Sequence, residues 1–181
     1  RGRRQLQASA SKPVAVILKI RNMTMPVGGD ERVADVETIL RAGERTLADM
    51  LWSLFVMRTD DFAEQAEDGS YHRVGRALTM EDLAAHLSGK RTVGVYAIEP
   101  RGQLVKWICW DIDTAEPSAA KGSIHAIQEK IAEHKLDARA SLVEFSGRKG
   151  YHVWLFFDPP IAAALAYHMG RVIAREAGVE C

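Results

Sequence analysis

Apolar runs and helical stripes alternate along the second half of the chain. Four apolar runs, grouped in two pairs around glycine-containing turns, predict two β-hairpins, and an apolar stripe at helical spacing follows each pair. The predicted strands are 92–98, 105–110, 138–145 and 151–157, and the predicted helices are 118–134 and 159–178. This order predicts an α+β fold in which helices back one face of a largely antiparallel sheet of two ββα units.

The first half of the chain predicts a helical subregion. Thr79 and Asp82 have the spacing of a capping box at the start of a helix that Gly89 would end. The other expected elements are a short strand at 13–20 and helices at 30–40 and from Thr46 onward.

Composition narrows the class of protein. The chain has 181 residues, of which 47% are hydrophobic, enough for one domain with a real core. It contains no run of about twenty apolar residues, so we expect no membrane span. Two cysteines, Cys109 and Cys181, cannot build a disulfide framework or a zinc cluster within this chain, and they fit a reducing cytoplasm.

Charge is balanced overall but unevenly distributed. The formal net charge is zero, which argues against bulk electrostatic attraction to nucleic acid. Six basic residues nevertheless precede the first acid, Asp30, and they fit either a basic arm or a solvated terminus. They are Arg1, Arg3, Arg4, Lys12, Lys19 and Arg21.

Two carboxylates end the apolar run 105–110. Asp111 and Asp113 are two residues apart, so on a strand they share one face while Ile112 points into the core. Paired carboxylates at a strand end suit a hard divalent cation such as Mg²⁺. Acids also end many strands without binding metal, and the interpretation therefore depends on what accompanies them.

A glycine-rich bend between the last two predicted strands supports the metal interpretation. It combines backbone N–H groups made accessible by glycine, two cations, a hydroxyl and an imidazole, which together suit a triphosphate. The candidate contacts are Ser146, Gly147, Arg148, Lys149, Gly150 and His152. His152 alternates with Trp154 and Phe156, so a half-buried core histidine is the alternative. A metal beside a triphosphate cradle indicates phosphoryl or nucleotidyl transfer.

These two motifs resemble the catalytic core of the archaeo-eukaryotic primase superfamily. The resemblance is particularly to bacterial primase-polymerases associated with CRISPR and other conflict systems. In that superfamily a strand-terminal D-x-D binds metal and an S-x-H or S-G-x-x-G-x-H element contacts the incoming nucleotide, matching 111–113 and 146–152 here. Segments 58–65, 68–71 and 87–96 also resemble the group, so the similarity runs from about Leu47 to the C-terminus.

The resemblance implies an RNA-recognition-motif-like core that performs template-directed nucleotidyl transfer. Its implied cofactors are Mg²⁺ or Mn²⁺. Its implied partners are a single-stranded DNA template, an RNA or DNA primer and NTP or dNTP. The resemblance also implies that the domain is part of a larger multidomain protein or defence complex and does not act at a membrane. Asp111, Asp113 and His152 would be catalytic. Arg58 and Tyr96 are weaker candidates for nucleotide contacts, with a structural ion pair and core-edge packing as the respective alternatives.

The implied organisation is an N-terminal appendage at 1–45, with a basic arm and a helix, followed by a catalytic core at 46–181. The family's third metal carboxylate lies on a later strand, which we expect beyond Cys181. Asp158 is a weak substitute, because its place before Pro159 suits a helix entry better.

Two rival functions stay open. A two-metal nuclease also needs clustered acids and a histidine, but it does not need a triphosphate cradle. A catalytically inert primase-like module that binds single-stranded nucleic acid could stack bases on Tyr151 and Trp154. A D-x-D glycosyltransferase is disfavoured, because the hairpin pattern does not provide a sugar-nucleotide fold.

Overall fold

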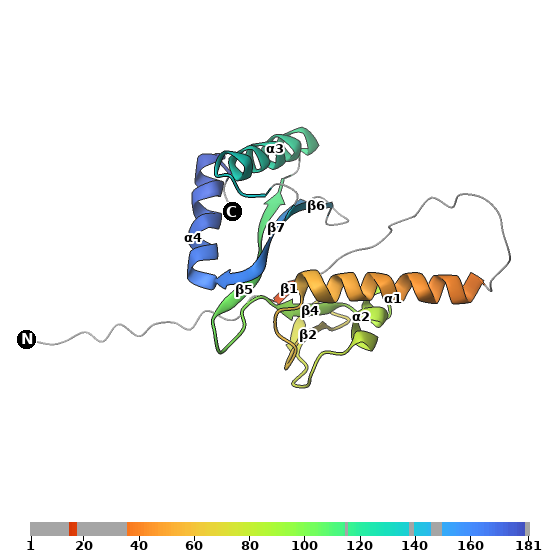
Figure 1. Ribbon diagram of the computed structural model, residues 1–181. Helices are drawn as coiled ribbons and strands as arrows, with labels where there is room; N and C mark the ends of the chain where they lie inside the picture. Colours follow the sequence, from red (N-terminus) through yellow and green to blue (C-terminus); the bar gives the residue numbers. More distant parts are fainter. Residues whose placement is uncertain (1–14, 18–35, 115, 138–139, 146–149, 180–181) are drawn as a thin grey trace, which may run out of the picture.

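Two antiparallel sheets form the framework of the computed structural model, which describes residues 15–17, 36–114, 116–137, 140–145 and 150–179 (Figure 1). Among these residues, a four-stranded sheet has the order β1-β4-β2-β3 and a three-stranded sheet has the order β5-β7-β6. The elements are β1 (Ala15–Ile17), α1 (Val36–Phe55), β2 (Ala63–Gln65), β3 (Tyr71–Arg73), α2 (Met80–Leu87), β4 (Val93–Tyr96), β5 (Leu104–Asp113), α3 (Pro117–Glu133), β6 (Ser141–Phe145), β7 (Gly150–Ala162) and α4 (Ala163–Glu176). The predicted α+β class is confirmed.

Two hydrophobic cores hold the elements together. The first contains Phe55 of α1 and Leu83 of α2 with Val93 and Val95 of β4, and it extends to Trp107 and Trp154 of the second sheet. The second lies between the other face of β5 and β7 and the helices α3 and α4, where the buried residues include Trp110, Ile127, Ile131, Val153 and Ile173. The sequence predicted helices on one face of the sheet, whereas both faces of the second sheet are partly covered.

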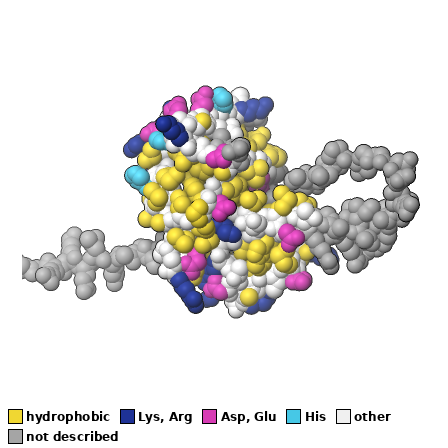
Figure 2. Space-filling view, in the orientation of Figure 1, with side chains coloured by type: hydrophobic (Ala, Val, Ile, Leu, Met, Phe, Trp, Pro, Cys, Tyr) yellow, Lys and Arg dark blue, Asp and Glu magenta, His cyan; other side chains and the backbone are white. Residues whose placement is uncertain are grey.

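Figure 2 shows the charged outer side of α3 at the top of the view and apolar side chains across the middle.

The hairpin expected at 92–110 does not form, although its turn does. The backbone N–H of Glu99 donates to Leu104 O at 3.0 Å, but β4 pairs with β1 and β2, and β5 pairs with β7. Both edges of β4 are thus occupied, and the chain crosses from one sheet to the other at this turn. Glycine and proline predict a turn, but they do not say which strands pair across it.

The second predicted hairpin is confirmed. β6 pairs with β7 in an antiparallel register that places Phe145 opposite Tyr151 and Glu144 opposite His152. Pro159 and Pro160, however, do not start a helix. β7 continues to Ala162 and pairs again with β5, and the prolines lie where four residues, 157–160, oppose Lys106 alone. Proline has no N–H for a strand ladder, so it is tolerated in such a bulge.

One continuous helix replaces the two that were expected at 30–40 and from Thr46. The helix α1 runs from Val36 to Phe55 through Gly43, and Thr46 lies inside it. A single internal glycine costs roughly 1 kcal/mol relative to alanine, which neighbouring helix formers and packing can offset. None of the described helices is long and apolar enough to cross a membrane.

The capping box at α2 is confirmed, and it is part of an ion-pair cluster around Asp82. The Asp82 side chain is 5% exposed and accepts hydrogen bonds from Arg76 at 2.7 Å, from Arg91 at 2.7 Å and from the backbone N–H of Thr79 at 3.0 Å. The hydrogen bond from Arg76 is the main reason that the pKa of Asp82 is lowered from 3.8 to about 2. A carboxylate held in this way links α2 to the loop before it and to the start of β4.

This cluster should make stability depend on acidity in a defined window. Because the pKa of Asp82 is lower in the folded than in the unfolded chain, its contribution is complete above about pH 5 and lost as the pH falls towards about 2. Allowing for partly exposed arginines, we expect roughly 1–2 kcal/mol. Urea unfolding of wild type and Asp82→Asn should show a difference in free energy that shrinks from pH 5 downward. Glu81→Gln, an exposed acid in the same turn, is the control, and a difference that does not change with pH would refute the interpretation.

Candidate active site

Three polar side chains lie in one row across the second sheet. Asp111 of β5 is opposite His152 of β7, and His152 is opposite Glu144 of β6. The imidazole stands between the two acids: Nε2 is 3.6 Å from Asp111 Oδ1, and Nδ1 is 3.1 Å from Glu144 Oε2. Strand register alone therefore brings together Asp111 and His152, which lie 41 positions apart in the chain.

Asp111 and Asp113 share a face, as predicted. Both are exposed, with the Asp111 side chain at 73%, while Ile112 between them is buried at 4% in the second core. Asp113 is opposite Gly150, which has no side chain that could cover the carboxylate. The end of β5 thus presents two accessible carboxylates beside His152.

The glycine-rich bend can be assessed only in part. Ser146, Gly147, Arg148 and Lys149 lie outside the described residues, so their predicted contacts stay predictions. The strands on either side are paired, since Phe145 is opposite Tyr151 and Asp113 is opposite Gly150. Phe145 and Gly150, the described residues on either side of the bend, therefore lie in strands that continue the polar row.

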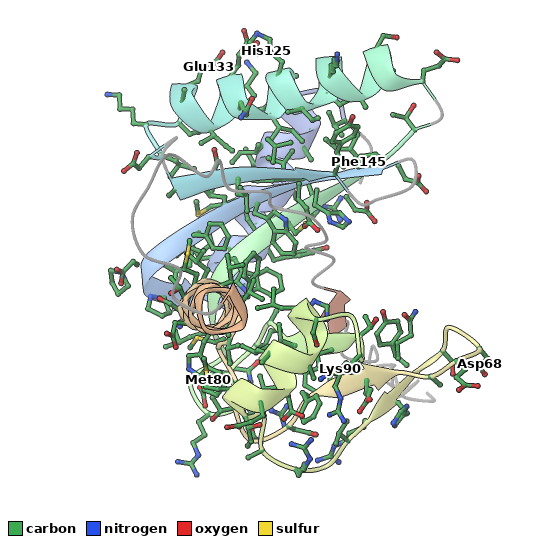
Figure 3. The ribbon with its side chains drawn as sticks, turned by 90° about the vertical axis from the view of Figure 1, so that its right-hand side faces the viewer. Asp68, Met80, Lys90, His125, Glu133 and Phe145 are labelled. Carbon is green, nitrogen blue, oxygen red and sulfur yellow. The ribbon has the colours of Figure 1, made fainter. Side chains whose placement is uncertain are left out.

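Glu144 is the site residue that sequence reasoning missed. Its side chain is 12% exposed, and one oxygen, Oε2, accepts hydrogen bonds from both Trp154 Nε1 at 3.0 Å and His152 Nδ1. The other oxygen, Oε1, is buried without a hydrogen-bond partner among the described residues. The predicted hairpin could have identified Glu144, because pairing Phe145 with Tyr151 puts Glu144 opposite His152. Figure 3 shows Phe145 at the end of β6, on the side of the sheet that α3 covers, so the alternating Glu144 belongs to the opposite face.

Arg58 and Tyr96 lie together on the first sheet and the loop before it. The Arg58 guanidinium carbon is 5.3 Å from the centre of the Tyr96 ring, and its nitrogens donate to both oxygens of Asp60 at 2.7 and 3.0 Å. The hydrogen bond to Asp60 is the main cause of a raised pKa at Arg58. The ion pair considered for Arg58 is therefore present, whereas its contact with a nucleotide stays a prediction.

Two alternatives from the sequence are wrong. Trp154 is fully buried against Phe55 and Trp107, so it cannot stack on a base. Asp158 lies in the bulge of β7 that opposes Lys106, towards the other end of β5 from Asp111. Trp107 is four positions before Asp111 on β5, which corresponds to about 13 Å. Asp158 therefore does not complete an acid cluster with Asp111 and Asp113.

A family model decides the identity of this fold and site. The model for the archaeo-eukaryotic primase domain of the TOTE conflict system matches residues 63–180, which include both sheets from β2 onward and all the residues of the polar row. The chain belongs to this primase family. No curated protein matches the chain. Domains of this superfamily are generally nucleotidyltransferases of the primase-polymerase type and typically use divalent metals.

The donor set fits a magnesium ion that relies partly on its substrate. Two exposed carboxylate oxygen donors on one face suit Mg²⁺, which usually keeps several waters and takes one or two carboxylates together with substrate phosphates. Within the described part of the chain, no group of three or more histidine, cysteine or acidic residues is placed to enclose a metal. An ion held by Asp111 and Asp113 would therefore take its other ligands from water and substrate.

Proposed function

We propose that this domain catalyses template-directed nucleotidyl transfer on single-stranded DNA, acting as a primase or primer-extending polymerase. The observation that carries the proposal is the alignment of the exposed pair Asp111 and Asp113 with His152 across β5 and β7. Membership of the primase family supports the reaction class. The zero net charge means that template binding would depend on local charge rather than on overall attraction.

Each part of the polar row has a role in this reaction. Divalent metal bound there would neutralise phosphate charge and lower the pKa of the attacking 3′-hydroxyl. Asp111 and Asp113 would hold the metal with their exposed oxygens. His152 would meet the triphosphate through Nε2, which faces the Asp111 side, and Ser146 with Arg148 or Lys149 would bind the remaining phosphate oxygens.

The role of His152 can be tested by binding alone. His152→Ala should weaken binding of a non-hydrolysable nucleoside triphosphate by about 1–3 kcal/mol, the range for a lost charge-assisted hydrogen bond. This corresponds to roughly 5- to 150-fold in affinity. Isothermal titration with Mg²⁺ present would measure it, and affinity for single-stranded DNA should barely change.

His125→Ala is a matched control, because His125 is 75% exposed on the outer side of α3, pointing away from the sheet (Figure 3). It should leave both affinities unchanged. If His152→Ala instead kept triphosphate affinity and lost DNA binding, the motif would have been assigned to the wrong substrate.

Incubation of the full-length protein with a primed single-stranded template distinguishes the proposal from its rivals. We expect Mg²⁺- or Mn²⁺-dependent extension or primer synthesis from nucleoside triphosphates. Cleavage of the template without nucleotide incorporation would indicate a nuclease. Template binding with neither reaction would indicate an inert binding module.

A further inference from the structure

We infer that Glu144 is a positioning residue for His152, a role that rests on the proposed nucleotide contact of that histidine. An ionised carboxylate only accepts hydrogen bonds, and Trp154 Nε1 only donates. The 3.1 Å contact between Glu144 Oε2 and His152 Nδ1 therefore requires the hydrogen on Nδ1. This bond fixes the plane of the ring so that Nε2 faces Asp111. A hydrogen bond from Nε2 to a phosphate oxygen then requires the imidazolium, which carries hydrogen on both ring nitrogens.

The surroundings of Glu144 argue against a purely structural role. Its neighbours on β6, Leu142, Val143 and Phe145, are apolar, and a buried carboxylate costs free energy unless it is fully hydrogen-bonded. One of its oxygens has no partner among the described residues. An apolar residue would pack better at this position. A carboxylate, in contrast, can orient an imidazole by accepting a hydrogen bond from the ring nitrogen that does not meet the ligand.

The position of Trp154 makes this support rigid. Trp154 is fully buried, with its ring 5.0 Å from that of Phe55 and 5.2 Å from that of Trp107, and its Nε1 holds the same Glu144 oxygen that contacts His152. The chain of contacts therefore runs from the first core through Trp154 and Glu144 to the imidazole. His152 itself is 17% exposed, and its Nε2 lies on the side of Asp111.

A double-mutant cycle on triphosphate binding separates positioning from an independent effect. Glu144→Ala should weaken binding of the non-hydrolysable triphosphate by about tenfold, the lower end of the range for carboxylates that orient histidine ligands. In a His152→Ala background the same change should have less than about a twofold effect, because the two residues act as one unit. Equal losses in both backgrounds would overturn the inference.

Trp154→Phe is the matched control, since it removes the Nε1 donor while keeping an aromatic ring in the core. It should reduce triphosphate affinity less than Glu144→Ala does. If Trp154→Phe reproduced the whole loss while the ring spectrum of His152 stayed unchanged, the loss would come from the core and not from the orientation of His152.

A second readout does not depend on nucleotide binding. The ¹⁵N chemical shifts of the His152 ring should show a protonated Nδ1 in the wild type and a changed Nδ1 signal in Glu144→Gln, which keeps the shape of the side chain. This variant also covers the case in which Glu144→Ala does not fold. An identical His152 spectrum in Glu144→Gln would overturn the positioning role.

The two proposals fail in different ways. If His152→Ala leaves triphosphate affinity intact, the proposed function of His152 is wrong, and the ring spectrum alone then decides whether Glu144 orients the imidazole. If His152→Ala weakens binding but neither Glu144 variant does, the function stands and the positioning role is wrong.

Discussion

Replacing Asp111 and Asp113 together with asparagine is expected to abolish nucleotide incorporation by the full-length protein. Both carboxylates lie at the exposed end of β5, and asparagine keeps their size while removing the charge that attracts a divalent cation. Losing electrostatic stabilisation of the transition state costs about 10²–10³-fold for a single neutral donor, so we expect at least this much here.

The same variant should fold normally. Asp111 is 73% exposed, and substitutions at such surface positions usually change the free energy of unfolding by less than about 0.5 kcal/mol. Primer extension with Mg²⁺ and Mn²⁺, beside a melting curve, measures both effects. Glu133→Gln on the outer side of α3, 60% exposed, is the control and should keep full activity. Unchanged synthesis by the double variant would mean that the metal lies elsewhere.

Phe55→Ala is expected to cause the largest loss of stability. Phe55 is 1% exposed at the end of α1, and its ring contacts Trp107, Trp154 and Phe156 of the second sheet at centroid distances of 6.5, 5.0 and 5.2 Å. Truncating a buried phenylalanine leaves a cavity in the core, which costs about 3–5 kcal/mol.

Chemical denaturation of Phe55→Ala and Leu54→Ala makes the comparison specific. Leu54 precedes Phe55 on the same helix but is 37% exposed, so its truncation should cost less than about half as much. Equal losses in the two variants would show that α1 does not join the two sheets through Phe55.

The sequence predicted the parts of this fold that depend on local pattern. The period of the apolar residues located α3 and the β6–β7 hairpin, and the D-x-D and glycine-rich motifs located the ends of β5 and β7. Alternation along a strand was sufficient to put Asp111 and Asp113 on one face, because that property needs no knowledge of the neighbouring strand.

The local pattern of apolar and polar residues did not predict which distant strands pair. Nothing local shows that β4 joins β1 and β2, or that β7 runs past two prolines to meet β5 again, because each depends on which edges other segments occupy. Glu144 was overlooked for a related reason. An acid in an otherwise apolar strand is informative only once the register shows that it lies opposite His152.

The most direct test of the account is a crystal structure of the full-length protein with Mn²⁺ and a non-hydrolysable nucleoside triphosphate. We predict an anomalous Mn²⁺ peak coordinated by Asp111 and Asp113, with a phosphate oxygen within hydrogen-bond distance of His152 Nε2 and with Nδ1 still on Glu144. Metal and triphosphate bound together at a site that does not include Asp111, Asp113 or His152 would contradict it.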